Sequence, residues 1–430
     1  MTSAVMVGAG PNGLAAAAFL ARAGLEVTVL EAADETGGGT RSSEALLPGL
    51  LHDHCSAIHP TAVTSPALRA LGLEQHGLRR RTADVDCVHP LDDGSAGVLP
   101  RSVPDTARLL GPDGDRYRPL LATPERHWDA LAHDVLGPLL RVPSHPLLLT
   151  VGHAAGWAVA EGGSQSIARA MERVLRTHGG TVHTGVRVTD PRQLPPADVT
   201  LLDLDPGQVA ALYGDRLPAP VRGAYRRFRR APAVFKLDLA VEGGVPWTNE
   251  HARRAATVHL GGPLAEVARA EQDVVAGHMP ERPFVLVGRQ YLADPSRSAG
   301  DIHPVYTYAH VPYGYDADAT EAILGQVERF APGVRDRIVG SRAIPPARFA
   351  TANPNFTGGD IITGAKTTPQ LLLGPRPALD PYATGLPGVF LCSAATPPGP
   401  GAHGMCGAGA AASALRHLGI PRKVMGHQMT

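Results

Sequence analysis

Three glycines and one acid near the start of the chain have the types and spacing needed to bind a dinucleotide. Gly8, Gly10 and Gly13 form the pattern G-x-G-x-x-G, and Glu31 follows at the distance expected of its acidic partner. The first glycine of such a pattern permits a tight turn, the second lets the backbone approach a pyrophosphate, and the third lets a helix pack closely on a strand. The phosphates meet free N–H groups at the helix N-terminus, and the acid accepts hydrogen bonds from a ribose diol.

The segments around these residues predict a strand, a helix and a second strand. Residues 3–7 form a short apolar run, residues 14–23 are rich in alanine and end at Gly24, and residues 25–30 carry alternate valines. A lone glycine motif is weak evidence, but here strand, helix, second strand and acid fall in register. We therefore expect a βαβ dinucleotide-binding unit, although this unit alone could hold NAD as well as FAD.

A second glycine cluster close behind the first favours FAD. Residues 37–41, with the sequence Gly-Gly-Gly-Thr-Arg, follow Glu31 within one loop. This cluster resembles the diglycine motif of FAD-binding oxidoreductases of the amine oxidase and phytoene desaturase type, and NAD dehydrogenases usually lack it.

The end of the chain predicts a second contact with a flavin. Residues 388–392 read as a buried strand, residues 393–401 as a loop, and residues 402–417 as a helix of small residues. The N–H groups and positive dipole of such a helix end would face N1 and O2 of the isoalloxazine, where negative charge collects on reduction. The alternative is that the small residues only allow close helix packing.

Motifs scattered over most of the chain resemble the phytoene desaturase-related FAD oxidoreductases, in the branch of pyridine nucleotide-disulfide oxidoreductase domain-containing protein 2. So many separate matches are more specific than the glycine motif alone. Beyond that motif they are Leu47-Pro48-Gly49, residues 52–60, Ala155-Gly156-Trp157, Gly162-Gly163-Ser164, Pro246-Trp247-Thr248, residues 257–262, Arg282-Pro283-Phe284, residues 294–297, His310-Val311-Pro312, Asn355 with Gly358-Gly359-Asp360, and residues 403–407.

The resemblance implies a two-domain FAD fold, noncovalent FAD, and redox or isomerase chemistry on a hydrophobic, often unsaturated substrate. The chain departs from the family between Tyr117 and Ala155, where relatives have a longer, largely helical insert. If the insert acts as a lid in the relatives, its absence would shorten or open the substrate cavity of this chain. A smaller natural product is therefore a better expectation than a long carotenoid.

The expected fold class is α/β, with a discontinuous Rossmann-like FAD-binding domain and a substrate domain built on a mostly antiparallel sheet plus helices. Strand-like stretches between residues 233 and 311 suit that second sheet, and the run 181–188 predicts a strand of the FAD-binding domain. We assign residues 1–70, 152–225 and 375–430 to the FAD-binding domain, and residues 71–151 and 226–374 to the substrate domain.

The predicted cofactor-binding residues come from all three segments of the FAD-binding domain. They are Gly8, Gly10, Pro11, Asn12, Gly13, Glu31, Gly38, Gly39, Thr40, Arg41, Ser56, Val186, Ser393, Ala394, His403, Gly404 and Met405.

Desaturation by FAD needs hydride loss to flavin N5 and proton loss to a base. Three histidines are candidates for that base: His54 and His59, which the resemblance places beside the isoalloxazine, and His403 at the mouth of the last helix. A histidine could accept a proton near neutral pH. The alternative is that each of them only satisfies backbone groups around the cofactor.

Composition limits the partners. The chain has 430 residues and a net charge of zero, so it offers no overall attraction to nucleic acid. Its four cysteines show no C-x-x-C pairing and no metal-type spacing, and no metal is expected.

No apolar run is long enough to span a bilayer, and we expect a cytoplasmic protein. The arginines at 79–81 and 226–230 could contact anionic lipid as peripheral membrane contacts, or could be solvated faces.

The leading hypothesis is an FAD-dependent desaturase or oxidase that acts on an apolar secondary metabolite and returns electrons to oxygen or a quinone. One alternative is a redox-neutral isomerase that uses reduced FAD. The other is a flavin-binding scaffold with a vestigial site. The sequence does not name the substrate or the oligomeric state.

Overall fold

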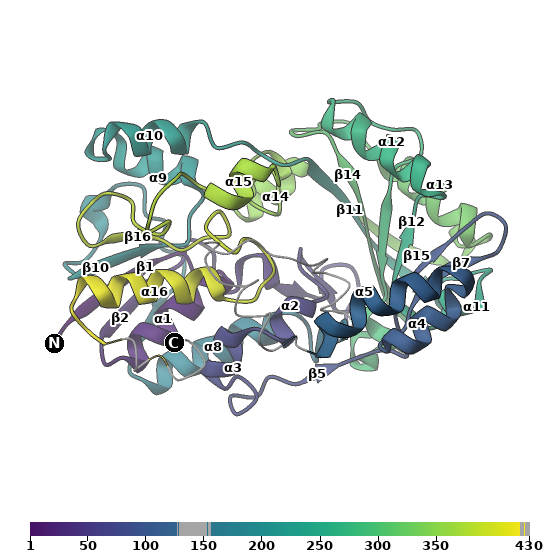
Figure 1. The fold of residues 1–430 in the computed structure, drawn as a ribbon, viewed down its shortest axis with the longest axis horizontal. Helices are drawn as coiled ribbons and strands as arrows, with labels where there is room; N and C mark the ends of the chain where they lie inside the picture. Colours follow the sequence, from purple (N-terminus) through teal and green to yellow (C-terminus); the bar gives the residue numbers. More distant parts are fainter. Residues whose placement is uncertain (127, 129–152, 154–155, 422–424, 426–430) are drawn as a thin grey trace.

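The chain folds into two lobes (Figure 1). The structure, a computed structural model, describes residues 1–126, 128, 153, 156–421 and 425. The shortening expected between Tyr117 and Ala155 lies mostly outside these residues, so it stays a prediction.

The first lobe is built on a parallel sheet of five strands in the order β16-β10-β1-β2-β9. The chain moves from β1 to β2 on one side and later places β10 on the other side. This makes the carboxyl end of β1 a topological switch point, where open α/β sheets bind ligands. The strands are β1 (Ser3–Val7), β2 (Glu26–Leu30), β9 (Thr181–His183), β10 (Val199–Leu202) and β16 (Val389–Leu391).

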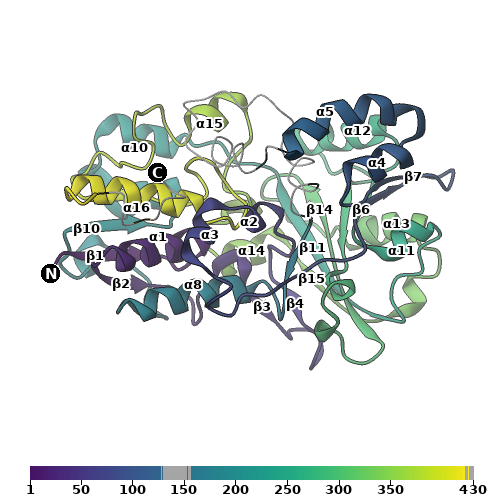
Figure 2. The same cartoon turned by 60° about the horizontal axis from the view of Figure 1, so that its bottom comes forward.

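Helices cover both faces of this sheet. On one face α1 lies between α8 and α16 (Figure 2), and the other face packs against α9 and α10. Small residues bring α1 and α16 close together, because a side chain at Gly407 would lie 2.0 Å from the Asn12 carbonyl oxygen. The helices of this lobe are α1 (Pro11–Arg22), α2 (Pro60–Val63), α3 (Pro66–Leu71), α8 (Gln165–Thr177), α9 (Pro206–Tyr213), α10 (Ala219–Arg226) and α16 (Met405–His417).

The second lobe is built on a seven-stranded sheet in the order β15-β11-β14-β13-β12-β6-β7. Its pairs are antiparallel apart from β12 with β6. Trp247, Ile323 and Phe330 belong to the apolar core of this lobe. The strands are β6 (Val85–Pro90), β7 (Ala96–Leu99), β11 (Ala233–Glu242), β12 (Ala255–Leu260), β13 (Val285–Gly288), β14 (Ile302–Val311) and β15 (Ile338–Ile344).

Shorter elements complete the fold. Two small ribbons pair β3 (Ser42–Ser43) with β4 (His52–Asp53), and β5 (Arg80–Arg81) with β8 (Val159–Ala160). The remaining helices are α4 (Val103–Leu109), α5 (Gly114–Arg126), α11 (Glu250–Arg254), α12 (Leu264–Val275), α13 (Thr320–Phe330), α14 (Pro346–Ala352) and α15 (Thr368–Leu373).

The predicted fold class is confirmed: a Rossmann-like domain is joined to a second, sheet-rich domain. All strands of the parallel sheet come from residues 1–70, 152–225 and 375–430. All strands of the seven-stranded sheet come from residues 71–151 and 226–374. The domain boundaries themselves remain predictions.

One predicted strand is shorter than the sequence indicates. The run 181–188 looked like a continuous strand, but β9 ends at His183. Gly185 has a φ of +71°, which turns the backbone out of the sheet. The Val186 N–H then donates to the Glu31 carbonyl oxygen at 2.8 Å, so this segment crosses the carboxyl end of the sheet.

A buried ion network joins the two lobes. Asp53 on β4 contacts Arg297 of the second lobe, with 2.6 Å between Oδ2 and Nη1, and both side chains are fully buried. The Ser164 N–H donates to Asp53 Oδ1 at 2.8 Å, and Lys236 donates from β11 to the Asp53 carbonyl oxygen at 2.9 Å. Burial acts to raise the pKa of the Asp53 carboxyl, but Arg297 and the hydrogen bonds from Ser164 and Ser42 outweigh it, so the pKa is lowered.

Within the part of the chain that the structure describes, no helix combines the length and apolar character needed to cross a bilayer. In one of the two arginine runs, Arg80 and Arg81 form ion pairs with Glu74 and Glu161. Their charge is therefore partly neutralised within the protein. Peripheral contact with a membrane stays a prediction.

Candidate functional site

The glycine turn between β1 and α1 has the geometry that its sequence predicts. Gly8 has a φ of +96°, which favours glycine. A side chain at Gly13 would lie 2.2 Å from the Gly8 carbonyl oxygen, so the third glycine lets the helix begin directly against the strand. A side chain at Gly10 would lie 2.5 Å from Oδ2 of Asp203. The turn therefore leaves no room for larger residues.

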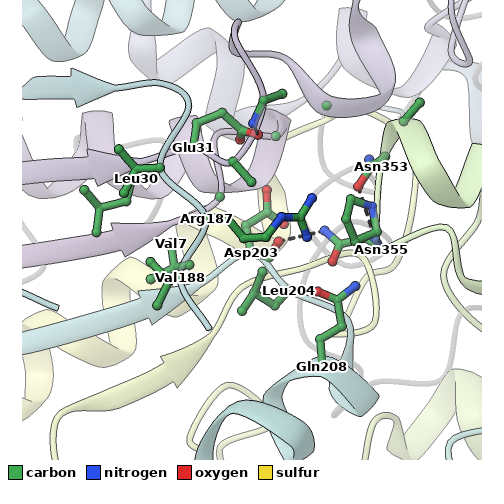
Figure 3. A pocket seen from close by; sticks show the side chains of 18 of the residues that line it. Val7, Leu30, Glu31, Arg187, Val188, Asp203, Leu204, Gln208, Asn353 and Asn355 are labelled. Carbon is green, nitrogen blue, oxygen red and sulfur yellow. Dashed lines mark hydrogen bonds between the residues drawn. The ribbon is translucent and has the colours of Figure 1, made fainter. Parts of the chain in front are cut away.

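A cavity of about 660 Å³ opens at the carboxyl end of the parallel sheet, and we call it the nucleotide cavity (Figure 3). Glu31 points into it and is held in place, because its carboxylate accepts from the N–H groups of Ala9 at 2.6 Å and Ala33 at 2.9 Å. Its lining residues include Gly8, Gly10, Glu31, Asp34, Glu35, Gly38, Arg41, Val186, Arg187, Asp203, Gln208, Asn353 and Asn355.

A second cavity, of about 480 Å³, continues from the first toward the seven-stranded sheet, and we call it the apolar cavity. Gly10, Gly38, Asp203, Asn353 and Asn355 line both, so the two cavities meet at the glycine turn. The rest of the apolar cavity includes Pro11, Asn12, Gly39, Thr40, Cys55, Ser56, Ala57, Ile58, Leu286, Gln290, Tyr306, Tyr308, Phe356, Ile361, Ile362, Ser393, Ala394, Gly401 and Ala402.

Three polar atoms of the apolar cavity fit a bound group with hydrogen-bonding edges. Asn12 Oδ1, Gln290 Nε2 and Ser393 Oγ are buried and have no hydrogen-bond partner among the described residues. A buried polar atom without a partner costs about 1–3 kcal/mol. Such a cost in a cavity is recovered when a ligand supplies the partner. An elongated dinucleotide would fill both cavities. If its second half is a ring with hydrogen-bonding atoms at its edge, it would also supply partners for these three polar atoms.

Most of the predicted cofactor-binding residues line one of these cavities. Gly13 does not, because it lies behind the turn and donates its N–H to Asp203 at 2.9 Å. Those that do are Gly8, Gly10, Pro11, Asn12, Glu31, Gly38, Gly39, Thr40, Arg41, Ser56, Val186, Ser393 and Ala394. Their role toward a cofactor stays a prediction.

The expected contact of the last helix with the flavin stays a prediction, and the start of this helix lies outside the lining of both cavities. His403, Gly404 and Met405 line neither cavity. His403 Nδ1 accepts from the Met405 N–H at 3.0 Å, so this N–H already has a partner. A side chain at Gly404 would lie 2.9 Å from Ala15 Cβ, because the helix entry packs on α1. The loop residues just before it, Gly401 and Ala402, line the apolar cavity instead.

The three candidate bases stay predictions, and none of them lines either of the two cavities. His54 hydrogen bonds to Ser43, with 2.7 Å between Nε2 and Oγ. His59 lies between Ser56 at 3.2 Å and Ser164 at 2.9 Å. Burial lowers the pKa of each of these histidines, and of His403, to about 4. Burial keeps them neutral at pH 7, and their hydrogen bonds lie among the loops around the cavities.

Acid should therefore destabilise the protein. In the unfolded chain His59 and His403 take up protons near pH 6.5, whereas in the folded protein they do so only at about 4. Because the folded-state pKa is lowered, their stability contribution is complete above pH 6.5 and is lost as the pH falls toward 4. The urea midpoint should be lower at pH 5 than at pH 7. His59→Gln should reduce that difference, and an unchanged difference would contradict the assignment.

The residues that close the nucleotide cavity opposite the glycine turn were not predicted from the sequence. Asp203 directly follows β10, and the position of an acid after a buried strand was a signal that could have found it. Asn355 donates from Nδ2 to the Asp203 carbonyl oxygen at 2.8 Å and accepts from the Asp205 N–H at 2.8 Å. Asn353 and Asn355 lie in the segment assigned to the second domain, so both domains build this cavity.

No group of side chains suited to hold a metal ion occurs among the described residues.

Comparisons with known proteins agree with this geometry. Residues 6–71 match the family of the NAD(P)-binding Rossmann-like domain. Together with the sheet-rich second domain, this match agrees with the resemblance to FAD-dependent oxidoreductases stated from the sequence.

Two curated proteins are among its relatives. Pyridine nucleotide-disulfide oxidoreductase domain-containing protein 2 of Mus musculus is 22% identical, over 96% of this chain and 93% of that protein. One of the polypeptides of limonene dehydrogenase from Castellaniella defragrans is 35% identical, over 26% of this chain and 21% of that protein.

Solved structures share the fold at low identity. An oxidoreductase from Methanosarcina mazei has a TM-score of 0.65 at 16% identity, over 96% of this chain and 100% of that chain. Putrescine oxidase bound to putrescine has a TM-score of 0.57 at 17% identity, over 96% of this chain and 99% of that chain.

Proposed function

We propose that this chain binds FAD noncovalently and desaturates or oxidises a neutral, hydrophobic small molecule, such as a secondary metabolite or an isoprenoid-like compound. One observation carries the proposal: a nucleotide cavity and an apolar cavity meet at the glycine turn. The ADP half of FAD would occupy the first cavity beside Glu31. The isoalloxazine and the substrate would occupy the second.

The lining of the apolar cavity favours a neutral substrate. Leu286, Phe356, Ile361 and Ile362 give it an apolar wall, and Asp203 is the one Asp, Glu, Lys, Arg or His among its described lining residues. Asp203 lies at the junction with the nucleotide cavity, away from that wall. A cationic amine, such as the putrescine in the related oxidase, would find no carboxylate there. The partial relative named for limonene supports the same substrate class.

When bound, FAD supplies the hydride acceptor, and the residues of this chain bind the substrate and exclude water. Tyr306 donates its hydroxyl to the Cys55 carbonyl oxygen, and burial raises its pKa well above 10. Burial likewise raises the pKa of Tyr308 to about 12. Both phenols keep their protons at neutral pH, so they orient the substrate without acting as its base. Burial raises the pKa of the Cys55 thiol to about 12, which supports noncovalent binding of FAD.

The purified protein should be yellow and should release FAD, with no FMN, when it is denatured. A pyrophosphate and a ribose diol are the groups that the glycine turn and Glu31 are built to hold. Chromatography of the supernatant after denaturation measures this directly. Protein that is colourless and cannot be reconstituted with FAD would contradict the proposal.

Anaerobic mixing tests the reaction and separates it from the alternatives. Limonene, a neutral monoterpene, should bleach the bound flavin in proportion to the product formed, and putrescine should not. Air or a quinone should restore the colour, because electrons must leave before the next turnover. Conversion only after prereduction would indicate an isomerase. No bleaching by any compound in a panel of neutral terpenoids would indicate a scaffold.

A further inference from the structure

A buried carboxyl lies at the place where the glycine turn is expected to receive a pyrophosphate. Asp203 is 6% exposed, and its Oδ2 accepts from the Gly13 N–H at 2.9 Å. A side chain at Gly10 would lie 2.5 Å from the same oxygen. The second glycine of the motif opens its Cα face to a phosphate, and here the Asp203 carboxyl lies on that face. Figure 3 shows this carboxyl inside the nucleotide cavity.

Asp203 acts as the cap of α1, which has no cap of its own. The residue before this helix is Gly10, and no side chain of the segment caps the helix or places an acid in its first turn. The N–H groups at such an end carry positive potential, and an anion there is stabilised by about 0.3–1 kcal/mol. The carboxylate and a pyrophosphate therefore compete for the same N–H groups.

The nucleotide cavity is already acidic. Its lining holds four carboxyls, those of Glu31, Asp34, Glu35 and Asp203, against the guanidinium groups of Arg41 and Arg187. Arg41 is also engaged with the backbone, because it donates to the carbonyl oxygens of Gly38 and Ala352. A pyrophosphate diester adds two negative charges. If Asp203 stays ionised, like charges meet at the helix N-terminus.

The surroundings of Asp203 allow it to gain a proton near neutral pH. Burial raises its pKa to about 7, the N–H groups of Gly13 and Gly10 oppose this rise, and Glu31 adds to it. The other titratable groups that face Asp203 are the thiols of Cys392 at the end of β16 and Cys406 on α16. Burial raises the pKa of both thiols, to about 12 for Cys406, so they are neutral. Asp205, two residues further on, is paired with Arg230.

We propose that Asp203 is protonated in the FAD complex and donates its carboxylic O–H to the pyrophosphate, so that binding FAD takes up one proton. The proton comes from solvent and enters on Oδ1, while Oδ2 continues to accept from Gly13. This inference rests on the proposed binding of FAD. It predicts that FAD affinity falls as the pH rises, because an ionised Asp203 must first be protonated.

Isothermal titration of the apoprotein with FAD tests this, in two buffers of different ionisation enthalpy. At pH 8 to 9 the difference in apparent enthalpy should correspond to uptake of about one proton per FAD, and the Kd should rise about tenfold per pH unit above pH 7. ADP-ribose carries the same pyrophosphate diester without the flavin, and it should take up the same proton. Binding of FAD without proton uptake in the wild-type protein would overturn the inference.

Variants assign the proton to Asp203. Asp203→Asn keeps an acceptor for Gly13 and an N–H donor for the phosphate, so its Kd should stay near the low-pH value of the wild type at every pH. Asp198→Asn, on the exposed segment before the same strand, is the matched control and should keep the wild-type pH dependence. Glu31→Gln should retain the proton uptake, shifted to lower pH. Proton uptake that persists in Asp203→Asn would overturn the inference. Absence of FAD binding to the wild-type protein at every pH would instead contradict the proposed function.

Discussion

Gly10→Val should abolish FAD binding. A Cβ atom at this position would lie 2.5 Å from Asp203 Oδ2, and the two methyl groups of valine would fill the face that a pyrophosphate must approach. A steric block of this kind should weaken FAD at least about a hundredfold, which corresponds to about 3 kcal/mol. Fluorescence titration of the apoprotein measures the Kd, and the circular dichroism spectrum reports on the fold.

Gly325→Ala provides the matched control for that experiment. Gly325 lies within α13 of the second lobe, and a Cβ atom there would have no neighbouring atom within 4 Å. This variant should bind FAD as the wild-type protein does. Full FAD occupancy in Gly10→Val would mean that the pyrophosphate lies elsewhere, and the assignment of the nucleotide cavity would then be wrong.

Asp53→Ala should destabilise the whole protein by about 3–5 kcal/mol, because it leaves Arg297 buried without its main partner. The Asp53 and Arg297 side chains are 0% and 1% exposed, so water cannot replace the lost contact. The removed carboxylate also accepts from Ser164, which begins the turn into α8. Chemical denaturation of the apoprotein gives the change in the free energy of unfolding.

A double replacement separates this effect from a loss of side-chain volume. Asp53→Leu combined with Arg297→Met removes both of these charges, and it should restore part of the stability that either single variant loses. The recovery is partial because Asp294, the second ion partner of Arg297, then keeps only its hydrogen bonds from Gly162 and Ser296. Asp84→Ala removes an exposed partner of Arg254 and should leave the unfolding transition unchanged. Equal unfolding curves for Asp53→Ala and the wild type would show that the network does not hold the lobes together.

Local patterns in the sequence predicted the dinucleotide-binding unit well, because that unit is built from neighbours in the chain. The apolar run 3–7 is β1 itself, and α1 begins three residues before the alanine-rich stretch 14–23 and ends one residue before it. The glycine spacing predicted the turn between β1 and α1, because only glycine fits where the strand and the helix meet so closely. This steric argument needs no knowledge of the rest of the fold. The strand-like stretches between residues 233 and 311 also predicted the second sheet, whereas the two-domain organisation was implied by the family resemblance.

The missing parts of the site depend on contacts between distant segments. Asn355 reaches Asp203 across 152 positions of sequence, and no periodicity reports such a contact. The surroundings of the candidate histidines could not be predicted for a related reason. His59 is 3% exposed and its ring nitrogens are occupied by serines, but burial and partners cannot be read from a motif. The residue type alone suggested a catalytic base, whereas the packing makes His59 a neutral hydrogen-bonding partner.

The strand order of the parallel sheet has a consequence for biosynthesis. β16, an edge strand of that sheet, is formed by Val389–Leu391, and the cavity residues Ser393, Ala394, Gly401 and Ala402 come after it. A ribosome therefore releases the glycine turn long before it releases the residues that complete the site. The first lobe cannot finish folding until residues 389–417 have left the ribosome, and its apolar surface must wait for that segment. Truncation within the final forty residues should yield protein that aggregates during expression.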